Sequence, residues 1–154
     1  MFGMVGEEGR MQGDAFSDDV NLTARLESLT KFYGVSLVIS AEILSHLSDP
    51  TIYHIRFLDK VQVKGRTEPI SIFEVLDGEP KHVMNLKLAT RDEFELGVFS
   101  IQSQDFAEAR EHFEHVLAIN PNDKATLMYM ERVDRFIEHG IPIDWDGVVA
   151  WTAK

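Results

Sequence analysis

Hydrophobic and polar positions change their spacing about halfway along the chain. Short β-branched and aromatic runs bounded by polar turns occupy the first half, at Val35–Ile39, Tyr53–Val63 and Pro69–Leu76. Such runs predict buried strands, and the last two are expected to form a hairpin or neighbouring strands. Between the first two runs, Ser40 can cap a short helix that continues to about Leu47. The first half is therefore predicted to have an α+β fold.

One helix is predicted before these strands, between Ser17 as N-cap and Gly34 as C-terminal stop. Its apolar positions share one face, which carries Leu22, Leu26, Leu29 and Tyr33. Asn21 and Arg25 are one helical turn apart on a different face. An amide beside a guanidinium could contact a phosphorylated ligand. The spacing alone favours a solvated arginine near Asp18 or Glu27.

Helical spacing dominates the second half of the chain. Capping signals and apolar stripes predict three helices there, over about 91–103, 106–119 and 123–139. Within residues 90–140, one tetratricopeptide-like repeat is indicated by Leu96, Gly97, Ala109, Phe113 and Pro121. A single repeat cannot bury its own faces, so these helices are expected to pack on the rest of the chain or on another copy.

The end of the chain is apolar and contains Trp145 and Trp151. An acidic protein seldom leaves such residues on its surface, so this tail is expected to dock against the helices or a partner. The sequence therefore divides into an α+β unit, a linker, tetratricopeptide-like helices and a docking tail, over 1–77, 78–89, 90–140 and 141–154.

Composition excludes several classes of protein. The 154 residues carry a net charge of −11 and include no cysteine, which rules out disulfides, zinc–thiolate sites and a catalytic thiol. Nucleic acid is not expected as a partner, because binding it needs concentrated positive charge. The sequence has no apolar run long enough for a membrane span, and its start does not resemble a secretory signal, so a cytoplasmic location is expected.

Two short motifs point to a known family. The first is Val20-Asn21-Leu22-Thr23-Ala24-Arg25-Leu26, and the second is Val63-Lys64-Gly65-Arg66. Together with their neighbours they closely resemble the class III adenylate/guanylate cyclase homology domain. The resemblance covers about residues 3–77 and represents the C-terminal part of that domain, which implies part of a ferredoxin-like fold.

The resemblance also implies a role for each residue of the motifs. Arg25 would stabilise negative charge on the α-phosphate in the transition state, and Asn21 would position the ribose. Lys64 would reach the β- and γ-phosphates. Asp14, seven residues before the asparagine, would accept the 6-amino hydrogen of adenine, so ATP is the expected nucleotide.

In this family two domains pair head to tail around the active site, so a homodimer or pairing with another cyclase domain is expected. Two Mg²⁺ or Mn²⁺ ions are held there by aspartates that belong to a Phe-x-Asp-Ile type motif and a later segment. Both segments would precede Met1, so this chain alone is expected to bind no metal and to be inactive. It would then be a truncated product or a half-domain.

Two functions remain open at this stage. The chain is either the C-terminal part of an adenylate cyclase that forms cyclic AMP and pyrophosphate from ATP, or a non-catalytic interaction module that pairs with a complete cyclase. In the first case Asp14, Asn21, Arg25 and Lys64 contribute to a composite site. In the second case the tetratricopeptide-like helices make the regulatory contact.

Overall fold

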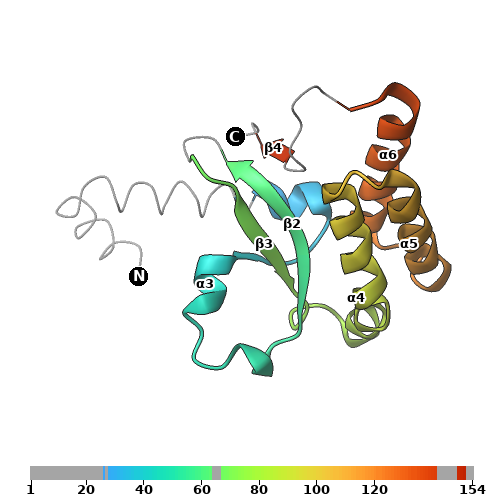
Figure 1. The fold of residues 1–154 in the computed structure, drawn as a ribbon. Helices are drawn as coiled ribbons and strands as arrows, with labels where there is room; N and C mark the ends of the chain where they lie inside the picture. Colours follow the sequence, from blue (N-terminus) through green and yellow to red (C-terminus); the bar gives the residue numbers. More distant parts are fainter. Residues whose placement is uncertain (1–25, 27, 64–66, 142–148, 152–154) are drawn as a thin grey trace.

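A small β-sheet lies beside a group of three helices in the computed structural model (Figure 1), which describes residue 26 and residues 28–63, 67–141 and 149–151. The strands are β1 (Val38–Ser40), β2 (Ile55–Val63), β3 (Ile70–Val75) and β4 (Val149–Trp151). The long helices are α4 (Lys81–Gln102), α5 (Phe106–Ile119) and α6 (Lys124–His139). The mixed α+β class expected from the sequence is confirmed.

The sheet has the strand order β1-β3-β2-β4. β3 pairs antiparallel with both β1 and β2, so the predicted hairpin is present. The first strand begins later than predicted, at Val38. Gly34 has φ of +69°, and the Val35 amide donates to the Thr30 carbonyl at 2.9 Å. Val35 therefore belongs to the exit from the preceding helix, because its amide completes that helix's last turn.

Local capping explains the short elements that follow β1. Ser40 is the N-cap of α3 (Ala41–Ser45), and its hydroxyl accepts a hydrogen bond from the Ile43 amide at 3.2 Å. A single 3₁₀ turn, η1 (Pro50–Ile52), then leads into β2. The predicted helix after Ser40 is thus confirmed.

A β-bulge in β2 changes which side chains face the core. The pairing with β3 shifts between Phe57 and Asp59. The buried positions are Arg56 before the bulge, Leu58 as its unpaired residue, and Asp59 and Val61 after it. An extra residue in one strand re-aims the side chains that follow it. The bulge therefore places a carboxylate in the interior of the protein.

The helices of the second half agree with the sequence except for the start of α4. α5 and α6 have the predicted bounds to within a residue, and Asp105 caps α5 by accepting from the Glu108 amide at 3.3 Å. α4 instead begins at Lys81, so most of the segment predicted as a linker is helical. Thr90 and Glu93 form the capping pattern from which the sequence predicts a helix start at 91, but Thr90 lies inside α4. Its hydroxyl there donates to the Leu86 carbonyl at 2.9 Å.

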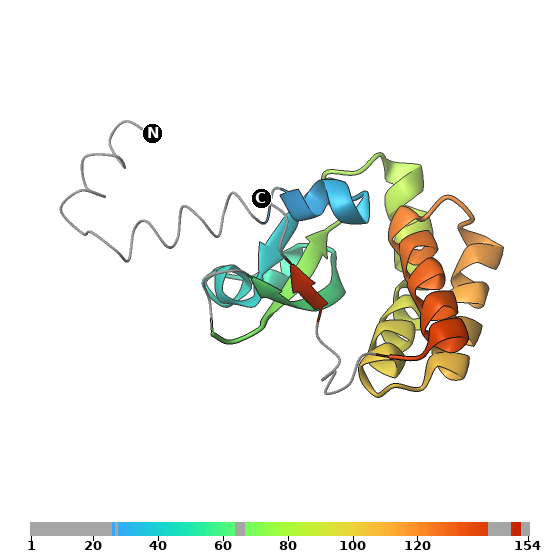
Figure 2. The same ribbon diagram turned by 90° about the horizontal axis from the view of Figure 1, so that it is seen from above.

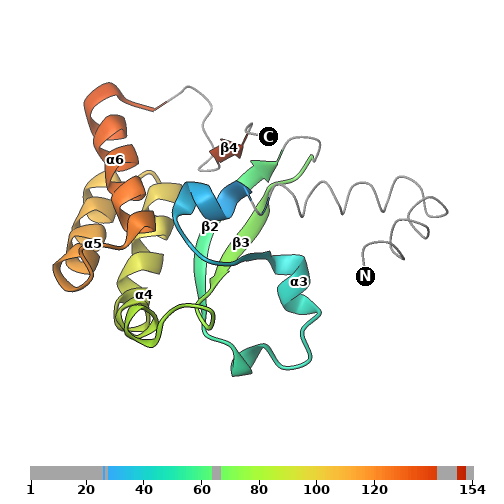
Figure 3. The same ribbon diagram turned by 180° about the vertical axis from the view of Figure 1, so that it is seen from behind.

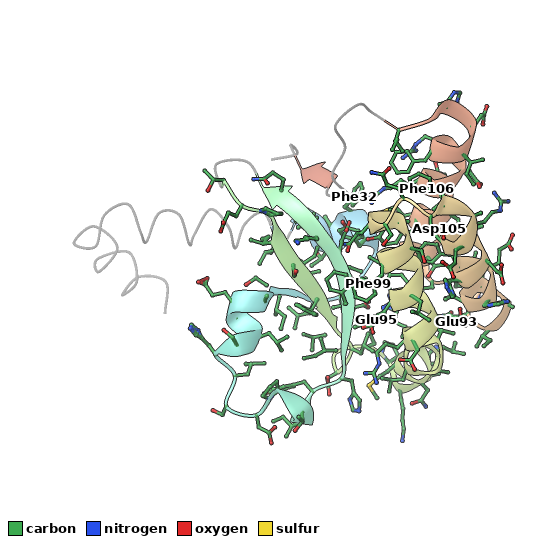
Figure 4. All side chains as sticks on the ribbon, viewed as in Figure 1. Phe32, Glu93, Glu95, Phe99, Asp105 and Phe106 are labelled. Atoms are coloured by element: carbon green, nitrogen blue, oxygen red, sulfur yellow. The ribbon has the colours of Figure 1, made fainter. Side chains whose placement is uncertain are left out.

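α4 is fixed to β2 by both a polar and an aromatic contact. Glu95 accepts a hydrogen bond from the Phe57 amide at 2.8 Å, and Phe99 stacks on Phe57 with ring centroids 5.2 Å apart (Figure 4). One hydrophobic core then continues from sheet to helices and includes Leu29, Val61, Ile72, Phe94, Phe113 and Tyr129. The boundary predicted near residue 78 therefore does not separate two cores.

α4 and α5 cross closely at Gly97. A Cβ atom at this position would lie 2.6 Å from the Phe113 ring, which is fully buried. The small residue is thus required by the helix crossing, as the repeat pattern suggested. The assignment of these helices to the tetratricopeptide class stays a prediction.

Replacing Gly97 with valine is expected to lower the free energy of unfolding by about 1–3 kcal/mol, because the fully buried Phe113 ring must shift to make room for the new side chain. Gly78→Val is the matched control, since a Cβ there would meet nothing within 4 Å. Urea unfolding of both variants measures the difference. Equal losses in the two variants would contradict the close crossing.

Part of the apolar tail joins the sheet. β4 pairs in parallel with β2, with Val149 beside Val61 and Trp151 beside Val63. The described part of the tail thus pairs with the sheet through its backbone. Docking of the rest of the tail against the helices or a partner stays a prediction. Across the residues that the structure describes, no helix combines the length and apolar character that crossing a membrane requires.

Candidate functional site

The four residues that the sequence assigns to a nucleotide site are Asp14, Asn21, Arg25 and Lys64, and all four lie outside the described residues. Their assignment stays a prediction. The described structure does include residues close to Arg25 and Lys64 in the chain. Leu26, which follows Arg25, and Val61, which shortly precedes Lys64, belong to the same buried cluster.

A helix connects this region to the rest of the protein. Residues 28–33 are helical and so is Leu26, and we call this segment the Tyr33 helix. Leu26, Leu29 and Tyr33 of its predicted apolar face are buried, which confirms that part of the face. Figures 2 and 3 show the Tyr33 helix extending from the sheet toward the start of α6.

Between sheet and helices lies a group of buried charges, which we call the junction network and which consists of Arg56, Glu74, Glu79, Lys87 and Asp123. At its centre Arg56 is fully buried. Its Nη2 lies 2.6 Å from Glu74 Oε1 on the paired strand, and its Nη1 lies 2.7 Å from Asp123 Oδ2 beside α6. The guanidinium also stands 3.9 Å from the Phe94 ring centroid.

Lys87 of α4 completes the junction network. Its Nζ donates to Glu74 and, at 3.0 Å, to Glu79 Oε2. Ser36 in turn donates its hydroxyl to Glu79. Charges this deeply buried are tolerated when each faces an opposite charge and its hydrogen bonds are made. The network therefore ties two strands, α4 and the start of α6 into one arrangement.

The pKa values in the junction network follow from this pairing. Burial alone raises the pKa of Asp123, but the facing Arg56 outweighs it and holds that pKa below its ordinary value. Burial likewise acts to raise the pKa of Glu79, and the Ser36 hydroxyl and Lys87 reverse the shift. These carboxylates are thus ionised at neutral pH.

A second buried group, the tyrosine cluster, consists of Tyr33, Asp59, Tyr129 and Arg132. Tyr33 donates its hydroxyl to Asp59 Oδ2 at 2.5 Å, and Arg132 Nη1 lies 3.6 Å from the same oxygen. Tyr129 donates to the Leu58 carbonyl at 2.7 Å. Burial raises the pKa of Asp59 although Arg132 and Tyr33 oppose the shift. The cluster joins the Tyr33 helix, β2 and α6.

The two aspartates predict opposite responses to acid. The lowered pKa of Asp123 contributes stability that is present above its unfolded-state pKa of about 4 and is lost as pH falls through its folded pKa. The raised pKa of Asp59 contributes stability that is present at low pH and is lost as pH rises through its folded pKa. Between about pH 7 and 2, the stability lost in Asp123→Asn should shrink with acidification.

Urea unfolding at a series of pH values checks this, with Asp59→Asn as the matched variant. The stability lost in Asp59→Asn, measured as the decrease in the free energy of unfolding, should grow as the pH falls. Parallel pH profiles for the two variants would show that the pairing partners assigned above do not control these carboxylates.

A cavity of about 240 Å³ lies next to the junction network, and its lining includes Glu79, His82, Lys87, Asp123 and Lys124. Three of these side chains, Glu79, Lys87 and Asp123, already belong to the network, so the walls carry few free charges. Among the described residues, no group of three or more His, Asp or Glu could hold a metal ion. The charges of the junction network thus join β2, β3, α4 and the start of α6.

Sequence reasoning missed both buried groups. A signal existed in the strands, since Arg56 and Glu74 lie within runs predicted to be buried. Opposite charges at such positions indicate a cross-strand pair. No comparable signal identified Asp59, because its inward position depends on the bulge, or Arg132, because its partner lies on a distant strand.

Comparison with known proteins finds adenylate cyclases. The terminal-differentiation-specific adenylate cyclase of Dictyostelium discoideum is 35% identical over 133 residues, or 86% of this chain and 6% of that protein. The adenylate cyclase of Anabaena cylindrica is 41% identical over 76 residues, or 49% of this chain and 15% of that protein. Adenylate cyclase 1 of Rhizobium meliloti is 35% identical over 74 residues, or 48% of this chain and 11% of that protein.

These matches establish that the chain contains a region related to adenylate cyclases, and the chain spans only 6% to 15% of the length of these three relatives. Because the first match takes in 133 of 154 residues, it includes at least residues 22–133 wherever it begins. The similarity therefore extends from the sheet across α4 and α5. No family model matches the chain, and no solved structure does.

Proposed function

We propose that this chain is the C-terminal part of the catalytic region of an adenylate cyclase, together with a helical segment that folds onto it. The observation that carries the proposal is the similarity to the Dictyostelium discoideum adenylate cyclase over 86% of the chain. A match of that extent requires both the sheet and α4 with α5 to be related to one cyclase. It thus favours a common origin over a chance fusion of a cyclase remnant with unrelated helices.

The proposed reaction converts ATP to cyclic AMP and pyrophosphate. The ribose 3′-oxygen loses its proton and forms a bond to the α-phosphorus, while the bond from that phosphorus to the leaving pyrophosphate oxygen breaks. Negative charge grows on the α-phosphate oxygens and on the leaving group. Arg25 would donate hydrogen bonds to the α-phosphate, where a preorganised donor typically contributes about 10²- to 10³-fold in rate.

The other predicted residues have separate tasks in this proposal. Asn21 would hold the ribose so that its 3′-oxygen faces the phosphorus, and Lys64 would bind the β- and γ-phosphates. Asp14 would accept the adenine 6-amino hydrogen, whereas guanine would present an acceptor oxygen to it and leave both groups unpaired. ATP is therefore the proposed substrate in preference to GTP.

Among the described residues, no group of three candidate metal ligands is present. The resemblance implies that the metal-binding aspartates lie in segments that come before the matched region, so in this proposal another polypeptide segment supplies them. The proposal is accordingly a composite site at an interface, to which this chain contributes the adenine, ribose and α-phosphate contacts.

The test is to mix the purified chain with the segment of the Anabaena cylindrica adenylate cyclase that precedes its region of similarity to this chain. Cyclic AMP is measured with ATP and Mn²⁺, and each polypeptide alone is the control. The proposal predicts cyclic AMP from the mixture well above both controls, and less product from GTP.

The competing function, an interaction module, gives a different result in the same experiment. A module of that kind would form no cyclic AMP in the mixture, yet it would change the rate of a complete cyclase when added to it. That pair of results would overturn the proposed catalytic role.

A further inference from the structure

The Tyr33 helix is held at its C-terminal end by α6, an element of the helical segment. Tyr33 is fully buried, and its hydroxyl donates to Asp59 on β2. The carboxylate of Asp59 is 3% exposed and faces the Arg132 guanidinium of α6. The cation that balances this buried carboxylate therefore comes from α6.

Aromatic contacts add to this hold. The rings of Tyr33 and Tyr129 lie with centroids 6.4 Å apart, and the Arg132 guanidinium stands 5.0 Å from the Tyr129 ring centroid. Tyr129 is itself fixed by its hydrogen bond to the Leu58 carbonyl. The orientation of the end of the helix is thus set by side chains that have little freedom of their own.

The chain leaves the Tyr33 helix directly against the start of α6. A Cβ atom at Gly34 would lie 2.6 Å from Cβ of Lys124, the first residue of α6. Gly34 also adopts a left-handed φ of +69°. A shift of α6 would therefore move the exit of the helix as well as its buried face.

We propose that Arg132 and Tyr129 of α6 are positioning residues for the nucleotide site, an inference that rests on the proposed function. Asn21 and Arg25 precede Tyr33 on what the sequence predicts to be a single helix. Through the tyrosine cluster, α6 sets the direction of this helix and hence where the Arg25 guanidinium meets the α-phosphate.

Positioning of this kind has a larger effect on the chemical step than on substrate binding. A displacement of about 1 Å in a group that stabilises the transition state can cost about 10²-fold in rate. In the proposed site, Asp14 binds adenine and Lys64 binds the distal phosphates. Neither residue lies between Ser17 and Gly34, where the sequence predicts the helix. Loss of the α6 contact should thus lower kcat much more than it changes KM for ATP.

The test compares Arg132→Gln with the matched control Arg135→Gln, since Arg135 lies on the same helix and its side chain is 64% exposed. Hydrogen exchange of the complete chain is measured by NMR. Arg132→Gln is expected to raise the amide hydrogen-exchange rates of residues 28–33 by about tenfold or more relative to those of α5. Arg135→Gln should leave the exchange rates of both segments unchanged. Equal increases in residues 28–33 and α5, or none, would overturn the inference.

Tyr33→Phe keeps the ring and removes only the hydrogen bond to Asp59, so it serves if Arg132→Gln does not fold. In the cyclic AMP assay, Arg132→Gln and Tyr33→Phe should each lower kcat by about 10-fold to 10²-fold with KM for ATP within about twofold, and Arg132→Lys should recover part of the loss. A rise in KM at unchanged kcat would contradict positioning. If the mixture that contains the unsubstituted chain forms no cyclic AMP, the proposed function is overturned. The hydrogen-exchange measurement then still decides whether α6 holds the Tyr33 helix.

Discussion

Replacing Arg25 with alanine is expected to lower cyclic AMP formation by the mixture about 10²- to 10³-fold. The proposed guanidinium donates hydrogen bonds to charge that develops only as the bond to pyrophosphate breaks, so its removal acts on the transition state rather than on bound ATP. The loss should therefore appear in kcat, with KM for ATP nearly unchanged.

Lys31→Ala is the matched control for this prediction. Lys31 is a cation in the same predicted helix, and it is exposed in the structure. Its removal changes the net charge as Arg25→Ala does and is expected to leave the rate within about twofold, because exposed charges act weakly through water. Equal losses in both variants would indicate a general charge effect and would remove the assigned role of Arg25.

Replacing Arg56 with methionine is expected to have the largest effect on stability, a loss of about 3–5 kcal/mol. The variant leaves the Asp123 carboxylate buried without the guanidinium that lies 2.7 Å from it, and it leaves Glu74 with Lys87 alone. These two buried carboxyl groups then lose the hydrogen bonds from Arg56, which methionine cannot supply. Urea unfolding at pH 7 measures the loss.

Two further variants separate the buried network from charge in general. Arg110→Met removes a partly exposed arginine that pairs with Glu114 and Asp134, and it should cost no more than about 1 kcal/mol. Combining Arg56→Met with Glu74→Gln and Asp123→Asn should recover much of the stability, since no unpaired buried charge remains. Failure of the combination to recover any stability would show that Arg56 acts through packing on Phe94 instead.

Elements with local signals could be predicted from the sequence. α5 and α6 begin and end where their caps and apolar stripes indicated, and Ser40 caps α3 as expected. β2 and β3 were identified from their β-branched runs. In each case the deciding interactions are between residues close together in the chain, so the sequence pattern reports on them directly.

Features that depend on distant contacts could not be predicted. The start of α4 was placed too late because Thr90 to Glu93 has a capping pattern that the structure uses inside a helix. The sequence does not indicate which element the tail pairs with, because the pairing of β4 with β2 joins residues far apart in the chain. The tyrosine cluster depends on the β2 bulge, which no local pattern specified.

The candidate nucleotide site was predicted by resemblance alone, and its four residues lie outside the described structure. The structure describes residues close to two of them. Leu26, next to Arg25, and Val61, three residues before Lys64, share one core, and α6 contacts the end of the Tyr33 helix. The helices α4 and α6 are thus joined to the sheet through buried contacts.

The most direct test of the central claim is the rate of cyclic AMP formation from ATP by the chain mixed with the complementing cyclase segment. Purified polypeptides are assayed with Mn²⁺, separately and together, and the product is identified by mass spectrometry. The account predicts cyclic AMP from the mixture, little from either polypeptide alone, and loss of the product in Arg25→Ala. Absence of cyclic AMP from a mixture in which both polypeptides are folded and associated would contradict it.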